Sequence, residues 1–505
     1  MISQRGLLIA WCVVLFCTGL FLYTRHNTFP PEFHADEPPK ATQVIERRPT
    51  YRQPLLLITA TEFVSRVLNE TKSIRQIVFT GRDISAVFAA SAIVFISLVG
   101  YVIFAGSLPA AIAVGVGALS CPQLLLLAHY MKEDTALVFG GAAFVLALWH
   151  NGREGTRRSA ALLGIATGVL ASAKYIGLLA IPLVYWLHST DREMRKPGAR
   201  RTFTIALTAC WCAINYLVVV NPLRFFSNLG TEAAHPIAGH HGLANPILFG
   251  SPVWRMLLAQ ANVTVLIIAL GYFAHSLVRW HRLSRAMRLL ILGPAVYLLL
   301  LSLSRFLLDR HLLPVTLAAY AMTGFAIAEL SAFLKRADLR WLATTALSAL
   351  LIATSIVPAR AMYHELKDET RLQVRAWLRD NLPASAVIAQ DRPTHLNISD
   401  PEFLAAYGAL PQKLVTPRDL FVTDLGSLAD LRKQGVTHVV TCDEAYARLF
   451  SEHVISAAER DEFHRRRARY EEIFSSGKLL FEAKPERPIG GSTSPVVRVY
   501  EISDS

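Results

Sequence analysis

The chain has 505 residues, of which 53% are hydrophobic and only 18% are charged, a composition that excludes an ordinary soluble globular protein. Its net charge of +13 would suit nucleic acid, but the Lys and Arg residues cluster between apolar runs, as in the cytoplasmic loops of membrane proteins, so we exclude nucleic acid as a partner. The six cysteines have no CxxC or Cys/His spacing, which argues against a zinc site and a disulfide framework.

The apolar runs in chain order predict a polytopic α-helical membrane protein. Arg5 is followed by a run from Gly6 to Tyr23 without a cleavage site, so we expect an uncleaved signal anchor. The runs cover 6–24, 83–105, 107–128, 134–150, 159–187, 203–220, 256–278, 288–303, 312–333 and 341–358. Basic segments lie at the N-terminus, 151–158, 188–201, 279–288 and 334–340. The positive-inside rule places these basic segments in the cytoplasm.

The run at 159–187 has basic residues on both sides, so the chain must enter the membrane and return within it. About 29 residues are too few for two full spans. We therefore expect a helical hairpin, or two short helices, that breaks around Ser172, Ala173 and Lys174 and puts Lys174 at the outer tip. Counting this hairpin as two crossings gives about 11 spans, with the N-terminus in the cytoplasm and the C-terminal part outside it.

The character of the sequence changes near Val357 and Pro358, which predicts a membrane domain over 1–358 and a soluble domain over 359–505. In the second, ETRLQVRAWLRDNLP (369–383) has the pattern of an amphipathic helix. Apolar runs at ASAVIAQ, THVVTC, KLLFEA and VVRVYEI, with the helical pattern DLGSLADLRKQG, indicate a small α/β fold. No catalytic motif stands out there, so we expect a non-catalytic domain that shapes acceptor access.

Just after the first run, the stretch FHADEPPK places Asp36 and Glu37 next to His34, on the predicted outer face. One interpretation is a catalytic carboxylate, with Asp36 accepting a proton from an acceptor hydroxyl. The other is a solvated exit from the first helix. Amphipathic stretches follow in KATQVIERRPTYRQPLLLITATEFVSRVL and would hold the acidic pair along the membrane interface.

A second acidic motif, AHYMKED, lies between the third and fourth runs and brings His129, Lys132, Glu133 and Asp134 to the same face. Ionisable groups at this depth are costly and tend to be functional. Alternatively, these charges only mark the interface or favour the start of the next helix. Asp36 and Asp134 could together grip an acceptor or share a divalent cation.

Cations also occur on this face, against the prevailing charge bias. Lys174, Arg305, Arg310 and His311 would suit a phosphate group, although each could instead snorkel to lipid headgroups. The loop 221–254 contains His235, His240 and His241. Their spacing lacks a helical pattern, so substrate contact or plain loop structure is favoured over metal ligation.

Taken together, these residues resemble the GT-C superfamily of polytopic glycosyltransferases, most closely the bacterial members of glycosyltransferase family 39, related to protein O-mannosyltransferases and aminoarabinose transferases. The resemblance covers most of residues 1–335. It rests on Asp36-Glu37, AHYMKED, SAKYIGLLAIP around Lys174 and RHLLPV from Arg310, together with the soluble C-terminal domain. The sequence departs from the pattern at Ala35 and the Pro-Pro pair around the acids, and no acceptor-recognition motif can be mapped.

The resemblance implies an inverting hexosyl- or pentosyltransferase of the bacterial inner membrane, which moves a sugar from a polyprenyl-phosphate donor to an extracytoplasmic protein, lipid or glycan. Asp36 would be the general base, with Glu37 beside it. Asp134, with Glu133 and His129, would bind the acceptor or a cation such as Mg²⁺ or Mn²⁺. Lys174, Arg305, Arg310 and His311 would bind the donor phosphate, and His240 and His241 would belong to a substrate loop.

The charge distribution agrees with this chemistry. Sugar transfer develops positive charge at the anomeric carbon and negative charge on the leaving phosphate, so it needs a carboxylate on one side and cations on the other. A transporter or flippase for a lipid-linked saccharide is the alternative, and it predicts internal repeats and ionisable residues near the midplane. We find no convincing repeat, and the charges gather at one face. A structural envelope protein acting through its soluble tail would leave these charged clusters unexplained.

Overall fold

A computed structural model describes residues 3–51, 54–70, 73–190, 198–238, 243–244, 251–304, 308–450, 454–455, 460–485 and 494–502. The chain forms two compact units. Unit 1 comprises Met1–Asn27, Pro39–Pro236 and Ile247–Ala359, and unit 2 comprises Thr28–Pro38, Ile237–Pro246 and Arg360–Ser505. The short segment 28–38, which contains Asp36, is therefore grouped with the C-terminal part of the chain.

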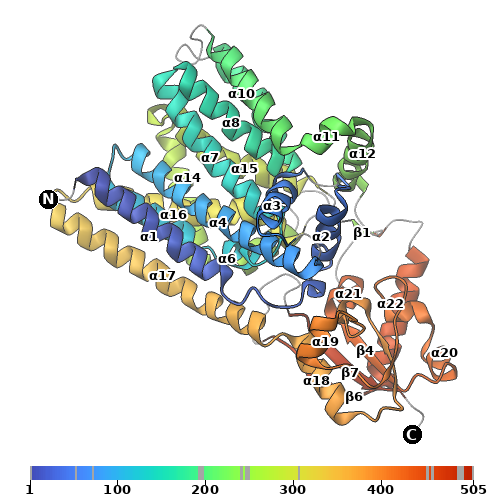
Figure 1. Cartoon of the computed structure of the whole chain (residues 1–505). Coiled ribbons are helices and arrows are strands. Elements are labelled where there is room, and N and C mark those ends of the chain that lie inside the picture. The colour runs from blue at the N-terminus through green and yellow to red at the C-terminus, as the bar shows by residue number, and fades with distance from the viewer. Residues whose placement is uncertain are drawn as a thin grey trace. The chain divides into compact units, whose positions relative to one another are not determined.

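Unit 1 is helical (Figure 1). Its first half contains α1 (Gln4–Thr24), α2 (Glu37–Glu46), which begins in the last residues of unit 2, α3 (Leu56–Val67), α4 (Ile74–Ile103), α5 (Leu108–Leu119), α6 (Pro122–Ala128), α7 (Glu133–Glu154), α8 (Arg157–Ala173), η2 (Tyr175–Leu179) and α9 (Ala180–Thr190). The second half contains α10 (Ala199–Ile214), α11 (Tyr216–Val220), α12 (Pro222–Ala238), α13 (Ser251–Gln260), α14 (Val263–Val278), η3 (Trp280–Arg282), α15 (Arg285–Ser302), η4 (Asp309–Leu312), α16 (Leu313–Ala332) and α17 (Ala337–Lys367). The last residues of α12 and α17 belong to unit 2.

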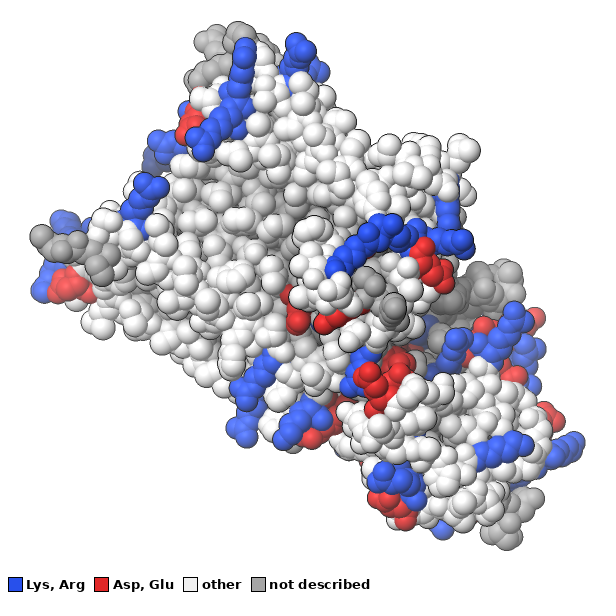
Figure 2. All heavy atoms as spheres, viewed as in Figure 1, with Lys and Arg blue, Asp and Glu red and all other residues white. Residues whose placement is uncertain are grey.

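Helices in the described part of the chain are long and apolar enough to cross a membrane. They are Gln4–Thr24, Ile74–Ile103, Glu133–Glu154, Asp309–Ala332 and Ala337–Asn381, and the bent pair Leu108–Leu119 and Pro122–Ala128 adds a sixth. Shorter apolar helices cover Tyr175–Thr190, Val263–Val278 and Met287–Ser302. The chain is thus built as a polytopic membrane protein, while the count of about 11 spans stays a prediction. Figure 2 shows a broad uncharged face on unit 1 with Lys and Arg at its margins.

The predicted break at 172–174 is confirmed. Helix α8 starts at a capping box formed by Thr156 and Ser159 and ends at Ala173. Lys174 has an extended backbone, with φ −155° and ψ 147°, and the chain resumes as η2 and α9. At Gly177, a side chain would collide with the carbonyl group of Leu170, so this return of the chain depends on glycine.

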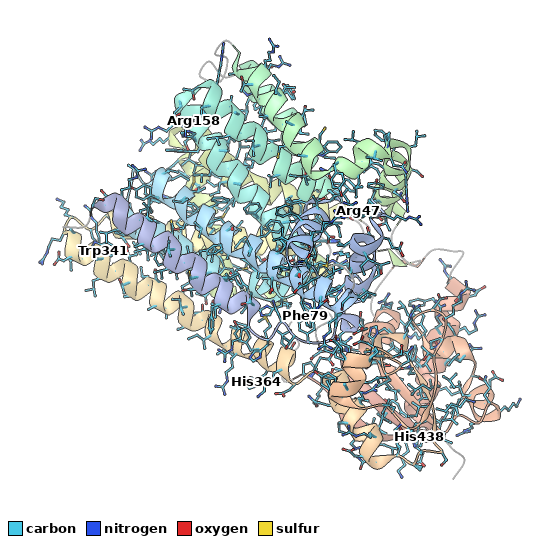
Figure 3. All side chains as sticks on the ribbon, viewed as in Figure 1. Arg47, Phe79, Arg158, Trp341, His364 and His438 are labelled. Carbon is cyan, nitrogen blue, oxygen red and sulfur yellow. The ribbon has the colours of Figure 1, made fainter. Side chains whose placement is uncertain are left out.

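Two apolar runs differ from the straight spans that the sequence predicts. The run at 107–128 divides at Ser120 and Cys121 into α5 and α6, which are bent by 62°, because Pro122 has no backbone N–H to continue the first helix. The apolar run ends at Val357 and Pro358 as expected, but the helix α17 continues to Lys367, with Pro358 inside it. Figure 3 shows Trp341 near the start of α17 and His364 near its end.

Small residues allow the helices of unit 1 to approach closely. A Cβ on Gly117 of α5 would lie 2.5 Å from the carbonyl oxygen of Tyr320 in α16, and one on Gly324 of α16 would lie 2.6 Å from that of Ala113. Gly164 and Gly168 on α8 face α10 in the same way. Membrane helices associate through such close packing, because the surrounding lipid gives little hydrophobic driving force.

Unit 2 contains a five-stranded mixed sheet with strand order β3-β2-β4-β7-β6. The strands are β2 (Val387–Gln390), β3 (Lys413–Val415), β4 (His438–Cys442), β6 (Lys478–Ala483) and β7 (Val497–Glu501). Strands β2, β3 and β4 run parallel, and β7 is antiparallel to β4 and β6. A separate short pair joins β1 (Leu243–Ala244) to β5 (Val454–Ile455).

The remaining elements of unit 2 are helices and short helical turns, and a core packs on each face of the sheet. They are η1 (Pro31–Phe33), α18 (Thr370–Asn381), η5 (Arg392–Thr394), α19 (Pro401–Tyr407), η6 (Val422–Leu425), α20 (Leu428–Lys433), α21 (Asp443–Phe450) and α22 (Arg460–Ser476). One face packs a core around Val439 and Tyr470, and the other packs Val374 and Leu378 of α18 against Val440 and Val499. The α/β elements expected from the apolar runs are therefore present.

Candidate functional site

The turn between α6 and α7 places the HYMKED residues in the interior of unit 1. Helix α6 ends when the His129 amide turns back to the carbonyl of Leu126, and Lys132 is extended before α7 begins at Glu133. The exposed fractions of Lys132, Glu133 and Asp134 are only 2%, 6% and 2%. Buried charges at these positions require partners, because their desolvation is costly.

Two lysines from distant segments pair with the two carboxylates. Lys40 of α2 donates to Glu133 Oε2 at 2.8 Å and to the carbonyl of Met131 at 2.9 Å. Lys174, in the break after α8, donates to Asp134 Oδ1 at 2.7 Å. The side chain of Lys174 remains 17% exposed, against 3% for Asp134. Lys174 is therefore the more exposed of the two lysines, because the side chain of Lys40 is 10% exposed.

Further cations surround Asp134. Arg310 and His311, from η4 at the start of α16, interact electrostatically with this carboxylate, as Lys174 does. Buried Lys132 lies within electrostatic range of His311. Lys132, Lys174 and Arg310 thus bring cationic groups near Asp134, and we call this cluster the positive centre. Cationic groups of these kinds suit an anion such as phosphate. Arg305 lies outside the described residues, so its place relative to this centre is still a prediction.

An apolar cavity of about 540 Å³ begins next to this centre. Leu137 and Val138 of α7 line it one turn after Asp134, Ile176 lines it just after Lys174, and Pro314 lines it just after His311. The remaining walls come from α4, α8, α9, α15 and α16. From α15, Tyr297 also lines the cavity and interacts electrostatically with Asp134. A cationic end next to an apolar body suits a ligand with an anionic head and a hydrocarbon tail.

Residues 33–38 of the FHADEPPK stretch belong to unit 2, and Pro39 and Lys40 belong to unit 1. After η1, the Asp36 amide donates to Nδ1 of His34 at 3.2 Å, and the Glu37 amide donates to the carbonyl of His34 at 3.0 Å. Ala35 is exposed and Asp36 is partly exposed, whereas Glu37 is completely buried at the start of α2. Of the acidic pair, Asp36 is therefore the more accessible to a substrate.

The other predicted site residues have different surroundings. His129 is buried, and its two ring nitrogens face the carbonyls of Leu125 and Arg25 at 2.6 and 2.9 Å, so metal ligation would require releasing one of them. His240 and His241 lie outside the described residues. Within the part of the chain that the structure describes, no three His, Cys, Asp or Glu side chains gather as a metal site requires.

Sequence reasoning missed Lys40, although it ends the FHADEPPK stretch itself. Its spacing from Glu37, three residues along a helix, was a usable signal. Nothing local pointed to Glu133 as its partner, because the two residues are 93 positions apart.

No protein-family model matches the chain, and no curated protein matches its sequence. Solved structures do match. The archaeal oligosaccharyltransferase AglB from Archaeoglobus fulgidus, in complex with an inhibitory peptide and a dolichol-phosphate, is 10% identical with a TM-score of 0.50, over 94% of this chain and 73% of that one. ArnT from Cupriavidus metallidurans, bound to undecaprenyl phosphate, is 15% identical with a TM-score of 0.48, over 98% of this chain and 97% of that one.

At these identities, the likeness to AglB shows a shared fold and no more. AglB is a GT-C glycosyltransferase, so the predicted resemblance to the GT-C superfamily is confirmed at the level of the fold. The chain has the architecture of this class of polytopic membrane proteins.

Proposed function

We propose that the chain is an inverting glycosyltransferase that moves a sugar from a polyprenyl-phosphate donor to an extracytoplasmic acceptor. The observation that carries this proposal is the positive centre around Asp134, whose sequence neighbours Leu137, Ile176 and Pro314 line an apolar cavity of about 540 Å³. A donor of this class has a phosphate head and a hydrocarbon tail. The complex of AglB with a dolichol-phosphate supports the same class of donor.

In this proposal, Lys174 and Arg310 bind the donor phosphate. The 2.7 Å bond to Asp134 holds the Lys174 ammonium in place, so its charge is oriented before the reaction begins. Negative charge grows on the phosphate as the bond to the sugar breaks, and fixed cations stabilise that charge more in the transition state than in the ground state. Asp134 would thus act by holding the cations.

Asp36 is the general base in this mechanism. Its partly exposed carboxylate accepts the proton of the acceptor hydroxyl while the hydroxyl oxygen forms a bond to the anomeric carbon. The bond from that carbon to the phosphate oxygen breaks in the same step, and polyprenyl phosphate leaves with the bonding electrons. One in-line displacement inverts the anomeric centre. Glu37 is buried beside Asp36 and is not needed to accept this proton.

A Mg²⁺ or Mn²⁺ ion would be held by Glu133 and Asp134. Both carboxylates already accept from a lysine ammonium, at 2.8 and 2.7 Å, so the ion would have to displace Lys40 or Lys174. No step of the proposed mechanism passes through a metal, and addition of a chelator tests whether one is needed.

The test is sugar transfer by the purified, detergent-solubilised chain from a panel of labelled polyprenyl-phosphate sugars to an envelope extract. Asp36→Asn should lower the rate by about 100-fold or more, because a general base contributes at least that factor. Lys174→Met should weaken binding of undecaprenyl phosphate. Glu46→Gln is the matched control, because Glu46 is an exposed carboxylate on α2.

Loss of transfer in Asp36→Asn, with donor binding kept, supports the assignment of the base. Full activity of Asp36→Asn would remove it. If the wild-type chain transfers no sugar from any donor in the panel, the glycosyltransferase proposal fails, and uptake of a lipid-linked saccharide into vesicles becomes the next assay.

A further inference from the structure

The segment that contains Asp36 is part of the C-terminal unit. Residues 28–38 form a compact unit with residues 360–505, although more than 320 positions separate them in sequence. Phe29 and Phe33 are 7% and 4% exposed. Such burial of aromatic rings on a short loop stabilises one placement of the loop backbone.

Phe33 is the apolar anchor of this segment. Its ring packs in a cluster with Ile398 and Phe403, bordered by Leu372 and Leu404. The Phe33 and Phe403 rings meet edge to face, with centroids 6.2 Å apart and planes at 79°, a favourable geometry for two aromatic rings. The cluster lies between α18 and α19, so these two helices determine where Phe33 sits.

Arg371 of α18 binds both the ring and the backbone of Phe33. Its guanidinium carbon lies 4.5 Å from the centroid of the Phe33 ring, and its Nη1 donates to the carbonyl of Phe33 at 3.1 Å and to that of Pro393 at 3.3 Å. The Nε group donates to Glu369 at 2.6 Å. Arg371 is 2% exposed, so this charge is buried with its carboxylate partner and with acceptors that only a planar fork can reach together.

Short local contacts connect Phe33 to Asp36. The Phe33 amide donates to the carbonyl of Pro30 at 3.2 Å, and the His34 amide donates to that of Pro31 at 3.3 Å. These two hydrogen bonds close the η1 turn. The His34 ring then accepts from the Asp36 amide. Asp36 follows Phe33 by three residues, and these hydrogen bonds restrict the backbone between them.

We infer that Arg371, together with Phe33, positions the Asp36 carboxylate for catalysis, so residues 360–505 hold the segment that carries the proposed base. Arg371 is a positioning residue, because it contacts the segment of the base and not the base itself. The inference rests on the proposed function, in which Asp36 accepts the proton of the acceptor.

A matched pair of variants of the full-length chain tests it. Arg375 lies one turn after Arg371 on α18, is also buried at 4% exposure and covers an aromatic ring, that of Phe403 at 4.9 Å. Its guanidinium donates to the carbonyls of Leu396 and Gly408, within residues 360–505. Arg371→Lys and Arg375→Lys thus make the same change at similar positions, but only Arg371 hydrogen-bonds to residues 28–38 directly.

The first measurement is hydrogen–deuterium exchange of the peptide that covers residues 28–38. Arg371→Lys should make it exchange about 10-fold faster, because a charged donor to the segment is lost, and Arg375→Lys should leave it unchanged. Phe33→Leu removes the aromatic ring that Arg371 contacts, so it should increase the exchange rate of residues 28–38 by a similar factor. Exchange of the α18 peptide shows in each case whether the unit is still folded.

The second measurement is sugar transfer. Arg371→Lys should lower kcat by about 100-fold with the donor KM unchanged, as expected when a base is misplaced by about 1 Å. Unchanged exchange over 28–38 in Arg371→Lys and Phe33→Leu overturns the inference, whatever the activity. Faster exchange with an unaltered kcat, in a chain that Asp36→Asn inactivates, also overturns it. A fully active Asp36→Asn variant shows instead that the proposed function is wrong, and the inference fails with it.

Discussion

At the scale of single residues, this chain handles buried charge in two ways. In unit 1, Glu133 and Asp134 each accept from a lysine, and in unit 2 Arg371 is paired with Glu369. Asp391 differs, because it has only neutral donors, namely the amides of Val422 and Cys442 at 2.7 and 2.8 Å and the Tyr470 hydroxyl at 2.5 Å. A carboxylate paired with a lysine or arginine keeps its charge at moderate pH. A buried carboxyl group that has only neutral donors can instead take up a proton in this range.

Asp391 should make the stability of the C-terminal unit depend on pH. Complete burial raises the pKa of Asp391 to about 7, although its three donors act in the opposite direction. In the unfolded chain this pKa is about 4. Between about pH 4 and pH 7, the folded state therefore keeps the Asp391 proton and the unfolded state loses it. Its contribution to stability is fully present below about pH 4 and is lost as the pH rises to about 7.

Replacement by Asn removes this titration. We expect the free energy of unfolding of the wild-type unit to fall by about 2 kcal/mol from pH 5 to pH 7 relative to Asp391→Asn. Hydrogen exchange of the β4 amides, corrected for the intrinsic rate at each pH, measures the difference. The control is Asp400→Asn, at the N-cap of α19, where Asn caps about as well. Parallel pH profiles of wild type and Asp391→Asn would contradict the expectation.

The residue scale also shows what the sequence can and cannot reveal. Lys174 and Asp134 were predicted to lie at one face from charge and topology, and the structure brings them within 2.7 Å. Arg371 and Phe33 could not be paired in advance, because they are 338 positions apart and each fits an ordinary local pattern. Long-range partners of buried charges leave no periodic signal in a single sequence.

At the scale of elements, apolar runs predicted the helices well and their breaks less well. The break at Lys174 followed from the charges on both sides of 159–187. The bend at Pro122 was missed because hydropathy continues without interruption through 107–128. At Pro358 the opposite happened, and the helix α17 continues past the proline and past the end of the apolar run. Hydropathy reports burial or lipid contact, and backbone hydrogen bonding decides where a helix bends or ends.

Close packing of α5 on α16 should make Gly324 intolerant of any side chain. A Cβ there would lie 2.6 Å from the Ala113 oxygen and from the Val114 Cα, both of which belong to the backbone. The two helices would have to move apart, so Gly324→Ala should lower the thermal unfolding temperature in detergent, at a cost of about 1–3 kcal/mol. Gly271→Ala on α14 is the control, because a Cβ there meets nothing within 4 Å, and alanine favours the helix. Equal unfolding temperatures for the two variants would contradict this account of the packing.

At the scale of the whole molecule, the residues proposed to bind the donor and the proposed base belong to different units. The positive centre around Asp134 and the apolar cavity belong entirely to unit 1, and the Asp36 segment, with Arg371, belongs to unit 2. The expected boundary between a membrane domain over 1–358 and a soluble domain over 359–505 is still a proposal. It did not anticipate that residues 28–38 are grouped with the second unit, since a short loop carries no compositional sign of the unit it joins.

A chain that ends at residue 359 should therefore separate donor binding from transfer. It keeps the lysine, arginine and cavity residues proposed to bind the donor, so it should bind labelled undecaprenyl phosphate with nearly the affinity of the full chain. It lacks α18 and α19, so Phe33 has no pocket and Asp36 is no longer held, and transfer should fall to the level of full-length Asp36→Asn.

Binding and transfer are measured on the same detergent preparation, after circular dichroism has shown that the helices remain. Full-length Asp36→Asn is the control for binding without transfer. Transfer by the truncated chain at the wild-type rate would show that Asp36 needs no support from the C-terminal unit. Loss of donor binding with the helices intact would show instead that unit 1 does not contain the donor site by itself, because truncation leaves every residue around Asp134 in place.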